Sequence, residues 1–93
     1  MINYEAVFVL RTEDDLFNKG KEIVDSELKK VDAEIQGEED MGVKDLAYLL
    51  GDQRKGHYYL YKFQTDPLQV QTFEDSIKHK AEILRHIVVK LDQ

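Results

Sequence analysis

Few side chains in this sequence have the types and spacing that catalysis requires. The two serines, Ser26 and Ser76, fall in segments with helical spacing and outside any nucleophile-elbow sequence. The histidines at positions 57, 79 and 86 match no common spacing of metal ligands. Cysteine is absent, which excludes disulfides, thiolate catalysis and cysteine-ligated metals. We therefore expect no catalytic residue, no bound metal and no cofactor.

Glu38, Glu39 and Asp40 are the remaining cluster of potential ligands. Three consecutive carboxylates could hold a cation, but in a bend they typically form a solvated turn. The glycines beyond residue 30 fit turns and bends, and no glycine-rich phosphate loop follows an expected strand. The sequence thus predicts that the protein is not an enzyme and binds no small-molecule substrate.

Length and composition indicate a single domain over residues 1–93. A chain of 93 residues is too short for two domains of ordinary size, and 42% hydrophobic with 34% charged residues is a globular balance. The first five residues lack the basic patch and apolar run of a secretory signal. No apolar stretch approaches the roughly 20 residues of a membrane-spanning helix. We expect a cytoplasmic protein without a membrane partner.

The net charge of −6 is unevenly distributed along the chain. Residues 1–40 carry five basic and twelve acidic side chains, whereas residues 41–93 carry eight basic and seven acidic ones. The whole molecule should therefore be repelled by nucleic acid at long range. Any anionic partner has to meet the second half of the chain.

Hydrophobic periodicity predicts six elements in the order βαββαβ. Strands are expected at residues 4–10, within 33–50, at 57–65 and at 86–91, with an acidic bend at 38–40 and a polar turn at 51–56. Helices are expected to begin at Thr12, which precedes Asp15 by three residues, and at Asp66, which precedes a proline. Gly20 inside the first helix indicates close packing there.

This order favours an α+β ferredoxin-like sandwich, a four-stranded antiparallel sheet with two helices on one face. The first and third strands would be central. Because strand side chains alternate, Phe8 and Tyr61 are expected to face the helices, and their neighbours the open side. The open face would then carry an apolar strip, which is typical of a partner-binding surface. The strip consists of Val7, Val9, Tyr58, Leu60, Ile87 and Val89.

Residues 55–62 resemble in part the third-strand signature of an RNA-recognition motif. The segment starts with the basic-Gly pair, but His57, Tyr58 and Lys62 stand where the signature has an aromatic, a small and an aromatic residue. On the first strand, Val7 and Val9 offer no planar side chain. A single-stranded RNA binder of this kind stays an alternative.

Residues 42–48, Gly-Val-Lys-Asp-Leu-Ala-Tyr, resemble the Gly-x-basic-polar-Leu-Ala-Tyr signature of the bacterial small-subunit ribosomal protein six family. The resemblance extends over nearly the whole chain. Its other landmarks are Tyr4-Glu5, Gly56 with Tyr58, Phe73-Glu74 and the basic entry into the last strand at Arg85. The sequence departs from the family at residues 49–51, where Pro-Ile is common, and at Asp45, where a second basic residue is common.

The resemblance implies a structural, non-catalytic component of the small ribosomal subunit. It implies binding to the central domain of small-subunit (16S) ribosomal RNA, together with ribosomal protein eighteen as a heterodimer. The candidate RNA contacts are Lys44, Arg54, Lys55 and Arg85. The candidate protein contacts are Tyr48, the tyrosine of the family signature, and the apolar strip. A basic partner would neutralise the acidic half of the chain.

Two other uses of a ferredoxin-like domain are alternatives. A small acyl-phosphate hydrolase needs an anion-cradling loop after the first strand, but residues 11–15 contain three acids that repel an anionic substrate. A ligand-sensing regulatory or dimerisation module usually dimerises through its sheet, and the apolar strip also fits that use.

Overall fold

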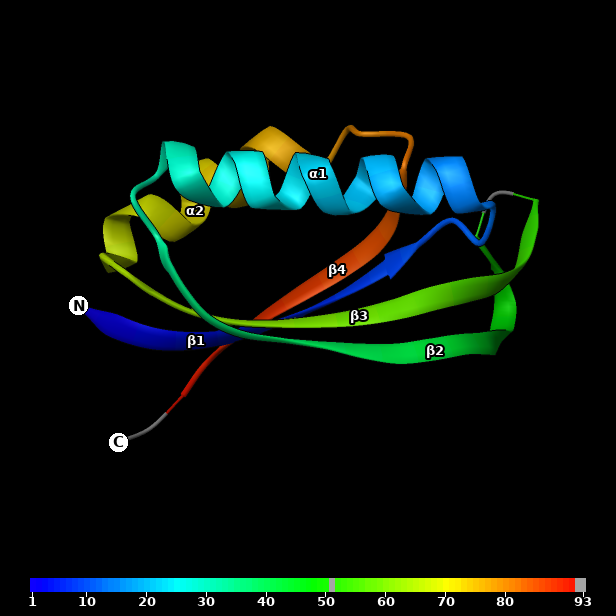
Figure 1. Ribbon diagram of the computed structural model, residues 1–93, viewed down its shortest axis with the longest axis horizontal. Coiled ribbons are helices and arrows are strands. Elements are labelled where there is room, and N and C mark those ends of the chain that lie inside the picture. The colour runs from blue at the N-terminus through cyan, green and yellow to red at the C-terminus, as the bar shows by residue number, and fades with distance from the viewer. Residues whose placement is uncertain (51, 92–93) are drawn as a thin grey trace.

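The computed structural model describes residues 1–50 and 52–91. Its elements follow the predicted βαββαβ order. They are β1 (Ile2–Leu10), α1 (Asp14–Lys30), β2 (Glu34–Leu50), β3 (Gln53–Thr65), α2 (Pro67–Ile77) and β4 (Ile83–Lys90). The strands form an antiparallel sheet in the order β2-β3-β1-β4, and both helices lie on one face of it (Figure 1). The ferredoxin-like α+β prediction, with β1 and β3 in the centre, is confirmed.

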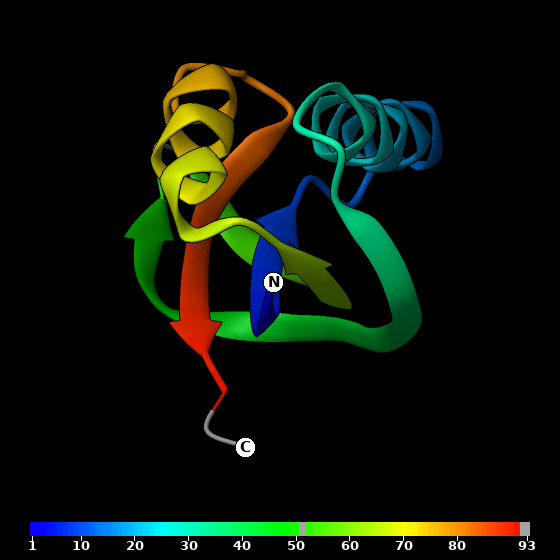
Figure 2. The same cartoon turned by 90° about the vertical axis from the view of Figure 1, so that its left-hand side faces the viewer.

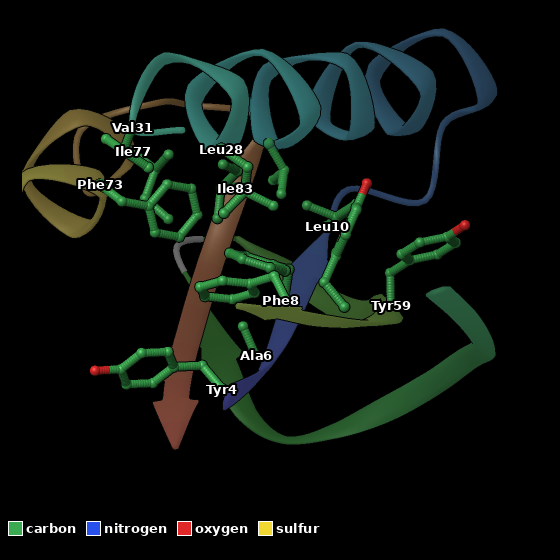
Figure 3. Packing of buried hydrophobic residues seen from close by; sticks show 13 residues of the cluster. Tyr4, Ala6, Phe8, Leu10, Leu28, Val31, Tyr59, Phe73, Ile77 and Ile83 are labelled. Carbon is green, nitrogen blue, oxygen red and sulfur yellow. The ribbon is translucent and has the colours of Figure 1, made fainter. Parts of the chain in front are cut away.

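Alternate side chains of the two central strands form the core between sheet and helices. Ala6, Phe8 and Leu10 of β1 are fully buried, as are Tyr61 and Phe63 of β3. The helices contribute Val24, Leu28, Phe73 and Ile77. The ring of Phe8 lies in the middle of this cluster (Figure 3) and meets Tyr61 edge-on, with ring centroids 5.6 Å apart. The predicted direction of the strand alternation is thus confirmed.

The helix signals in the sequence are confirmed at two positions and wrong at one. Asp66 caps α2, because its Oδ1 accepts a hydrogen bond of 2.9 Å from the backbone N–H two residues later. Gly20 packs closely, since a Cβ there would lie 3.2 Å from Cδ2 of Leu10. Thr12 does not cap α1. Glu13 holds the cap position without a side-chain bond, and two acids in the first turn interact favourably with the helix dipole instead.

Three strands begin earlier than the sequence indicates, and the first of them, β1, begins at Ile2 and not at Tyr4. Residues 53–56, expected in a polar turn, extend β3, because their backbone continues the ladder with the end of β2. Gly51, the first residue of that expected turn, lies outside the described residues. β4 begins at Ile83 and not at His86, since Ile83 pairs with Leu10 beyond a register shift.

β2 is a long strand whose register against β3 shifts at three places, the first between Ile35 and Gly37. Its register against β3 shifts after Asp40, at the expected acidic bend, where Gly42 adopts a left-handed φ of 87°. The register shifts again between Asp45 and Leu50, and residues 46–49 between these paired positions have no partner on β3 in the described chain. We call residues 46–49 the strap. In Figure 2, β2 passes beneath the other strands and its end rises beside β4.

The strap covers part of the open face, so the expectation that Val9 is exposed there is wrong. Val9 points to the open face but is only 6% exposed, because Leu46 and Tyr48 lie beside it around a small hollow. Gly56 lies beneath this contact. A Cβ at position 56 would come within 2.3 Å of Cγ1 of Val9 and 3.4 Å of Cδ2 of Leu46. The packing of the strap therefore requires glycine at this position.

We expect Gly56→Ala to lower the free energy of unfolding by about 1–3 kcal/mol, because the added methyl group overpacks the contact between β1 and the strap. Gly37→Ala is the matched control. It also adds a methyl group to a strand glycine, but the nearest atom, Cβ of Lys62, lies 3.9 Å away. Urea titrations of the parent and both variants measure the difference. Equal losses in the two variants would contradict the role of Gly56.

Candidate functional site

The strand register brings residues from all four strands into one row across the open face. Tyr58 of β3 lies opposite Val9 of β1, and Val9 lies opposite Arg85 of β4. From β2, Nζ of Lys44 lies 5.5 Å from the centroid of the Tyr58 ring. Two of the candidate RNA contacts, Lys44 and Arg85, therefore flank an apolar centre on the open face.

The other two candidate RNA contacts lie on β3, at the same end of the sheet. Nζ of Lys55 is 3.7 Å from Oδ1 of Asp45, and both side chains are exposed. Arg54 borders a hollow that the strap also lines. Because an exposed ion pair contributes little free energy, Lys55 can exchange Asp45 for another anion. All four candidate basic residues thus lie near the end of β1, but Lys55 points to the helix side of the sheet, because its neighbour Gly56 faces Val9 on the open side.

Arg85 makes an unusual contact for a surface arginine. Its Nη1 donates a hydrogen bond of 2.6 Å to the hydroxyl of Tyr48 in the strap. Within residues 1–50 and 52–91, no carboxylate lies at ion-pair distance from Arg85. The guanidinium is therefore held by a neutral group and keeps its full positive charge.

The apolar strip is partly exposed and partly covered. Ile87 and Val89 of β4 are 57% and 48% exposed, whereas Val7 and Tyr58 are half-buried and Val9 is buried. A hollow of about 200 Å³ is lined by Val7, Val9 and Ile87, together with Tyr58 and Arg85. This part of the open face combines an apolar floor with one cation at its rim.

Leu60 is separated from the rest of the strip by its surroundings. It is half-buried and borders a hollow of about 250 Å³ together with Glu38, Glu39 and Lys62. Of the three carboxylates of the expected bend, Glu39 lies opposite Leu60, whereas Glu38 accepts a hydrogen bond from the Tyr59 hydroxyl and Asp40 contacts His57, both on the helix side. This end of the open face therefore carries charges of both signs, from Glu39 and Lys62.

The position of the strap over the open face is the feature of this candidate site that the sequence did not predict. Tyr48 was expected on an edge strand, but it lies over the open face beside Arg85. One signal was present in the sequence: residues 46–50, Leu-Ala-Tyr-Leu-Leu, are all apolar or aromatic. An edge strand with one solvated face would alternate instead. The contact with β4 carries no sequence signal, because 37 residues separate Tyr48 from Arg85.

The two histidines on the strands, His57 and His86, make their contacts on the helix side of the sheet. The His57 ring stacks on Phe17 of α1 at 3.7 Å between centroids, and its Nε2 lies 2.7 Å from Oδ1 of Asp40. His86 lies 3.0 Å from Glu74 of α2. The hydrogen bond with His57, followed by one from a backbone N–H, holds the pKa of Asp40 below its ordinary value of 3.8. The stack on Phe17 and the pair with Glu74 join the sheet to the helices, and the pair with Asp40 joins β3 to β2.

No group of three or more histidines and carboxylates is arranged to hold a metal ion in residues 1–50 and 52–91. In the same residues, neither helix is long and apolar enough to cross a membrane.

Comparisons with known proteins point to one family. The family model described as "Ribosomal protein S6" matches residues 3–90. The small ribosomal subunit protein bS6 of Treponema pallidum (strain Nichols) is 33% identical over 92 residues, which cover 99% of either chain. The protein of the same name from Phytoplasma australiense is 36% identical over 93 residues, which cover 97% of this chain and 99% of the relative.

Solved structures share the fold. The 30S ribosomal protein S6 from Thermotoga maritima has a TM-score of 0.75 at 23% identity and covers 97% of this chain and 87% of its own. The P2 domain of the chemotaxis kinase CheA, solved in complex with the response regulator CheY, has a TM-score of 0.66 at 11% identity and covers 97% and 98%. At these identities, the likeness concerns the fold alone.

We expect Asp40→Asn to reduce stability at about pH 6 and to have less effect at about pH 2.5. The lowered pKa of Asp40 means that its contribution is present above pH 3.8 and is lost as the pH falls below that value. Because Asp40 is half-exposed, the difference should stay below about 1 kcal/mol. Urea titrations at both pH values measure it. Glu39→Gln controls for the loss of one neighbouring charge, and an identical pH response of the two variants would contradict the assignment.

Proposed function

This chain belongs to the ribosomal protein S6 family and is a structural, non-enzymatic component of the small ribosomal subunit. We propose that it binds the central domain of 16S ribosomal RNA as a heterodimer with ribosomal protein eighteen. One observation carries the proposal. An acidic molecule presents a sheet face without helices, and Lys44 and Arg85 place basic side chains at one end of that face.

The apolar strip is the proposed contact with ribosomal protein eighteen. Its most exposed members, Ile87 and Val89, lie on β4, and Val7 lies beside Ile87 on β1. Burying aliphatic surface contributes about 25 cal/mol per Å², so these side chains favour a partner that covers them. A basic partner fits best, because the net charge of this chain is −6 and Glu39 lies opposite Leu60 at the border of the strip.

The basic end of the open face is the proposed contact with RNA. Lys44 and Arg85 flank the row on the open face, Arg54 lies beside the strap, and Lys55 follows on the other face of β3, at the rim of the sheet. Basic side chains that neutralise phosphates release counterions, which makes such binding sensitive to salt. The protein and RNA contacts therefore occupy adjoining parts of one face, and a bound partner would complete the surface that the RNA meets.

The alternative of an RNA-recognition-motif-like binder has less support in the structure. Such a binder stacks bases on aromatic side chains of its sheet. Of the aromatic residues on β3, only Tyr58 points to the open face, whereas Tyr59, Tyr61 and Phe63 are buried toward the helices. Dimerisation through the same strip is the remaining competitor, and the experiments below distinguish it by the species that forms.

We expect the isolated protein to bind a central-domain RNA fragment at least about tenfold more weakly than its complex with ribosomal protein eighteen. The physical reason is the net charge of −6, which opposes phosphate binding until a basic partner offsets it. Filter binding at fixed salt, with each protein alone and with the two together, measures the affinities. Tight and specific binding by the lone chain would contradict the proposal.

We expect Ile87→Asp to weaken association with ribosomal protein eighteen by about tenfold or more, because a carboxylate buried without a partner is unfavourable. The control is Leu68→Asp on α2. Leu68 is 83% exposed, and a new carboxylate near the helix N-terminus leaves that helix stable. Isothermal calorimetry measures association, and sedimentation of the lone chain tests for a homodimer. Equal affinity of both variants would show that the strip is not the contact.

A further inference from the structure

The strap joins the two edges of the sheet. In the strand order β2-β3-β1-β4, β2 and β4 lie at opposite edges with two strands between them. The hydroxyl of Tyr48 nevertheless accepts the hydrogen bond from Nη1 of Arg85 at 2.6 Å. The end of β2 therefore crosses the open face, in agreement with its course in Figure 2.

Packing fixes the position of the strap independently of this hydrogen bond. Leu46 and Tyr48 lie around the same hollow as Val9 and Tyr58, and Val9 is almost completely buried there. Gly56 lets the strap approach, because a Cβ at that position would touch both Val9 and Leu46. The Tyr48 ring is 61% exposed and borders this hollow, so the packing of Leu46 places the strap and the hydroxyl of Tyr48 reaches Arg85 from it.

A phenol is an unusual partner for holding a surface arginine. A carboxylate would neutralise the guanidinium, whereas the hydroxyl of Tyr48 accepts one of its five N–H donors and leaves the charge unchanged. The remaining donors of this exposed side chain are available to a ligand. Beneath them, Val7, Val9 and Ile87 form an apolar floor, which strengthens electrostatic interactions at the rim.

We infer that Tyr48 is a positioning residue that holds the Arg85 guanidinium ready for a phosphate group of the RNA backbone. A flexible arginine loses conformational freedom when it binds, and a side chain that is already oriented loses less. Planar guanidinium groups bind phosphate in a fork geometry, so orientation matters more here than for a lysine. The inference rests on the proposed function, because it assumes that Arg85 contacts RNA.

The test compares Tyr48→Phe, Arg85→Ala and the double variant in complex with ribosomal protein eighteen and a central-domain RNA fragment. Tyr48→Phe keeps the ring and removes only the hydroxyl, and we expect RNA affinity to fall about threefold to tenfold. The salt dependence should stay that of the parent, because the charge of Arg85 remains. Arg85→Ala should weaken binding and lower the salt slope by roughly 0.7–0.9. In the Arg85→Ala background, Tyr48→Phe should have no further effect.

Two further measurements separate positioning from a structural role. NMR relaxation of the Arg85 side-chain Nε–H in the lone protein should show greater mobility in Tyr48→Phe than in the parent. Calorimetry without RNA should give equal affinities of Tyr48→Phe and the parent for ribosomal protein eighteen. Tyr4→Phe, which removes a hydroxyl from the helix side of β1, is the control and should match the parent in every measurement.

The possible failures are distinguishable. If Arg85→Ala leaves RNA affinity and salt slope unchanged, the proposed RNA contact of Arg85 fails, and the inference fails with it. If Arg85→Ala weakens binding but Tyr48→Phe does not, only the inference is overturned. An equal effect of Tyr48→Phe with and without Arg85 would also overturn it, because the hydroxyl would then act on another group.

Discussion

Ala6, Phe8 and Leu10 are fully buried beneath the two helices, and this packing of β1 constrains the rest of the molecule. Because side chains on a strand alternate between its faces, it places Val7 and Val9 on the opposite side. The antiparallel register then carries the same division to β3 and β4. A shift of one residue on any strand would exchange core and surface, so the buried aromatic cluster also determines which residues a partner can meet.

The two faces of the sheet differ in the contacts that their side chains make. The helix face contains the aromatic core and the contacts that link strands to helices, among them the stacking of His57 on Phe17 and the pair of His86 with Glu74. On the open face, exposed Ile87 and Val89 adjoin a basic region formed by Arg85 and Lys44. The face therefore offers an apolar region and a basic region side by side, as the proposed contacts with a protein and with RNA require.

The sequence was sufficient for features that depend on neighbouring residues. The order of elements, the alternation on β1 and β3 and the cap at Asp66 are all local patterns, and the structure confirms them. Features that depend on distant contacts were not predictable. The burial of Val9 and the start of β3 at Gln53 follow from the course of β2 over the open face. The same holds for the site: the four basic residues could be named, but the contact of Arg85 with Tyr48 could not.

The contact of Gly56 with Val9 has a consequence for how this chain can change over time. The two positions share one volume, since a Cβ at 56 would occupy the space of a Val9 methyl group. A larger residue at 56 is therefore compatible only with a smaller residue at 9 or with a strap that lies farther from the sheet. In a set of related sequences, these positions should vary together with position 46, although they are separated along the chain. The size of a single side chain on β1 thus limits which sequences can fold the end of β2 across the open face.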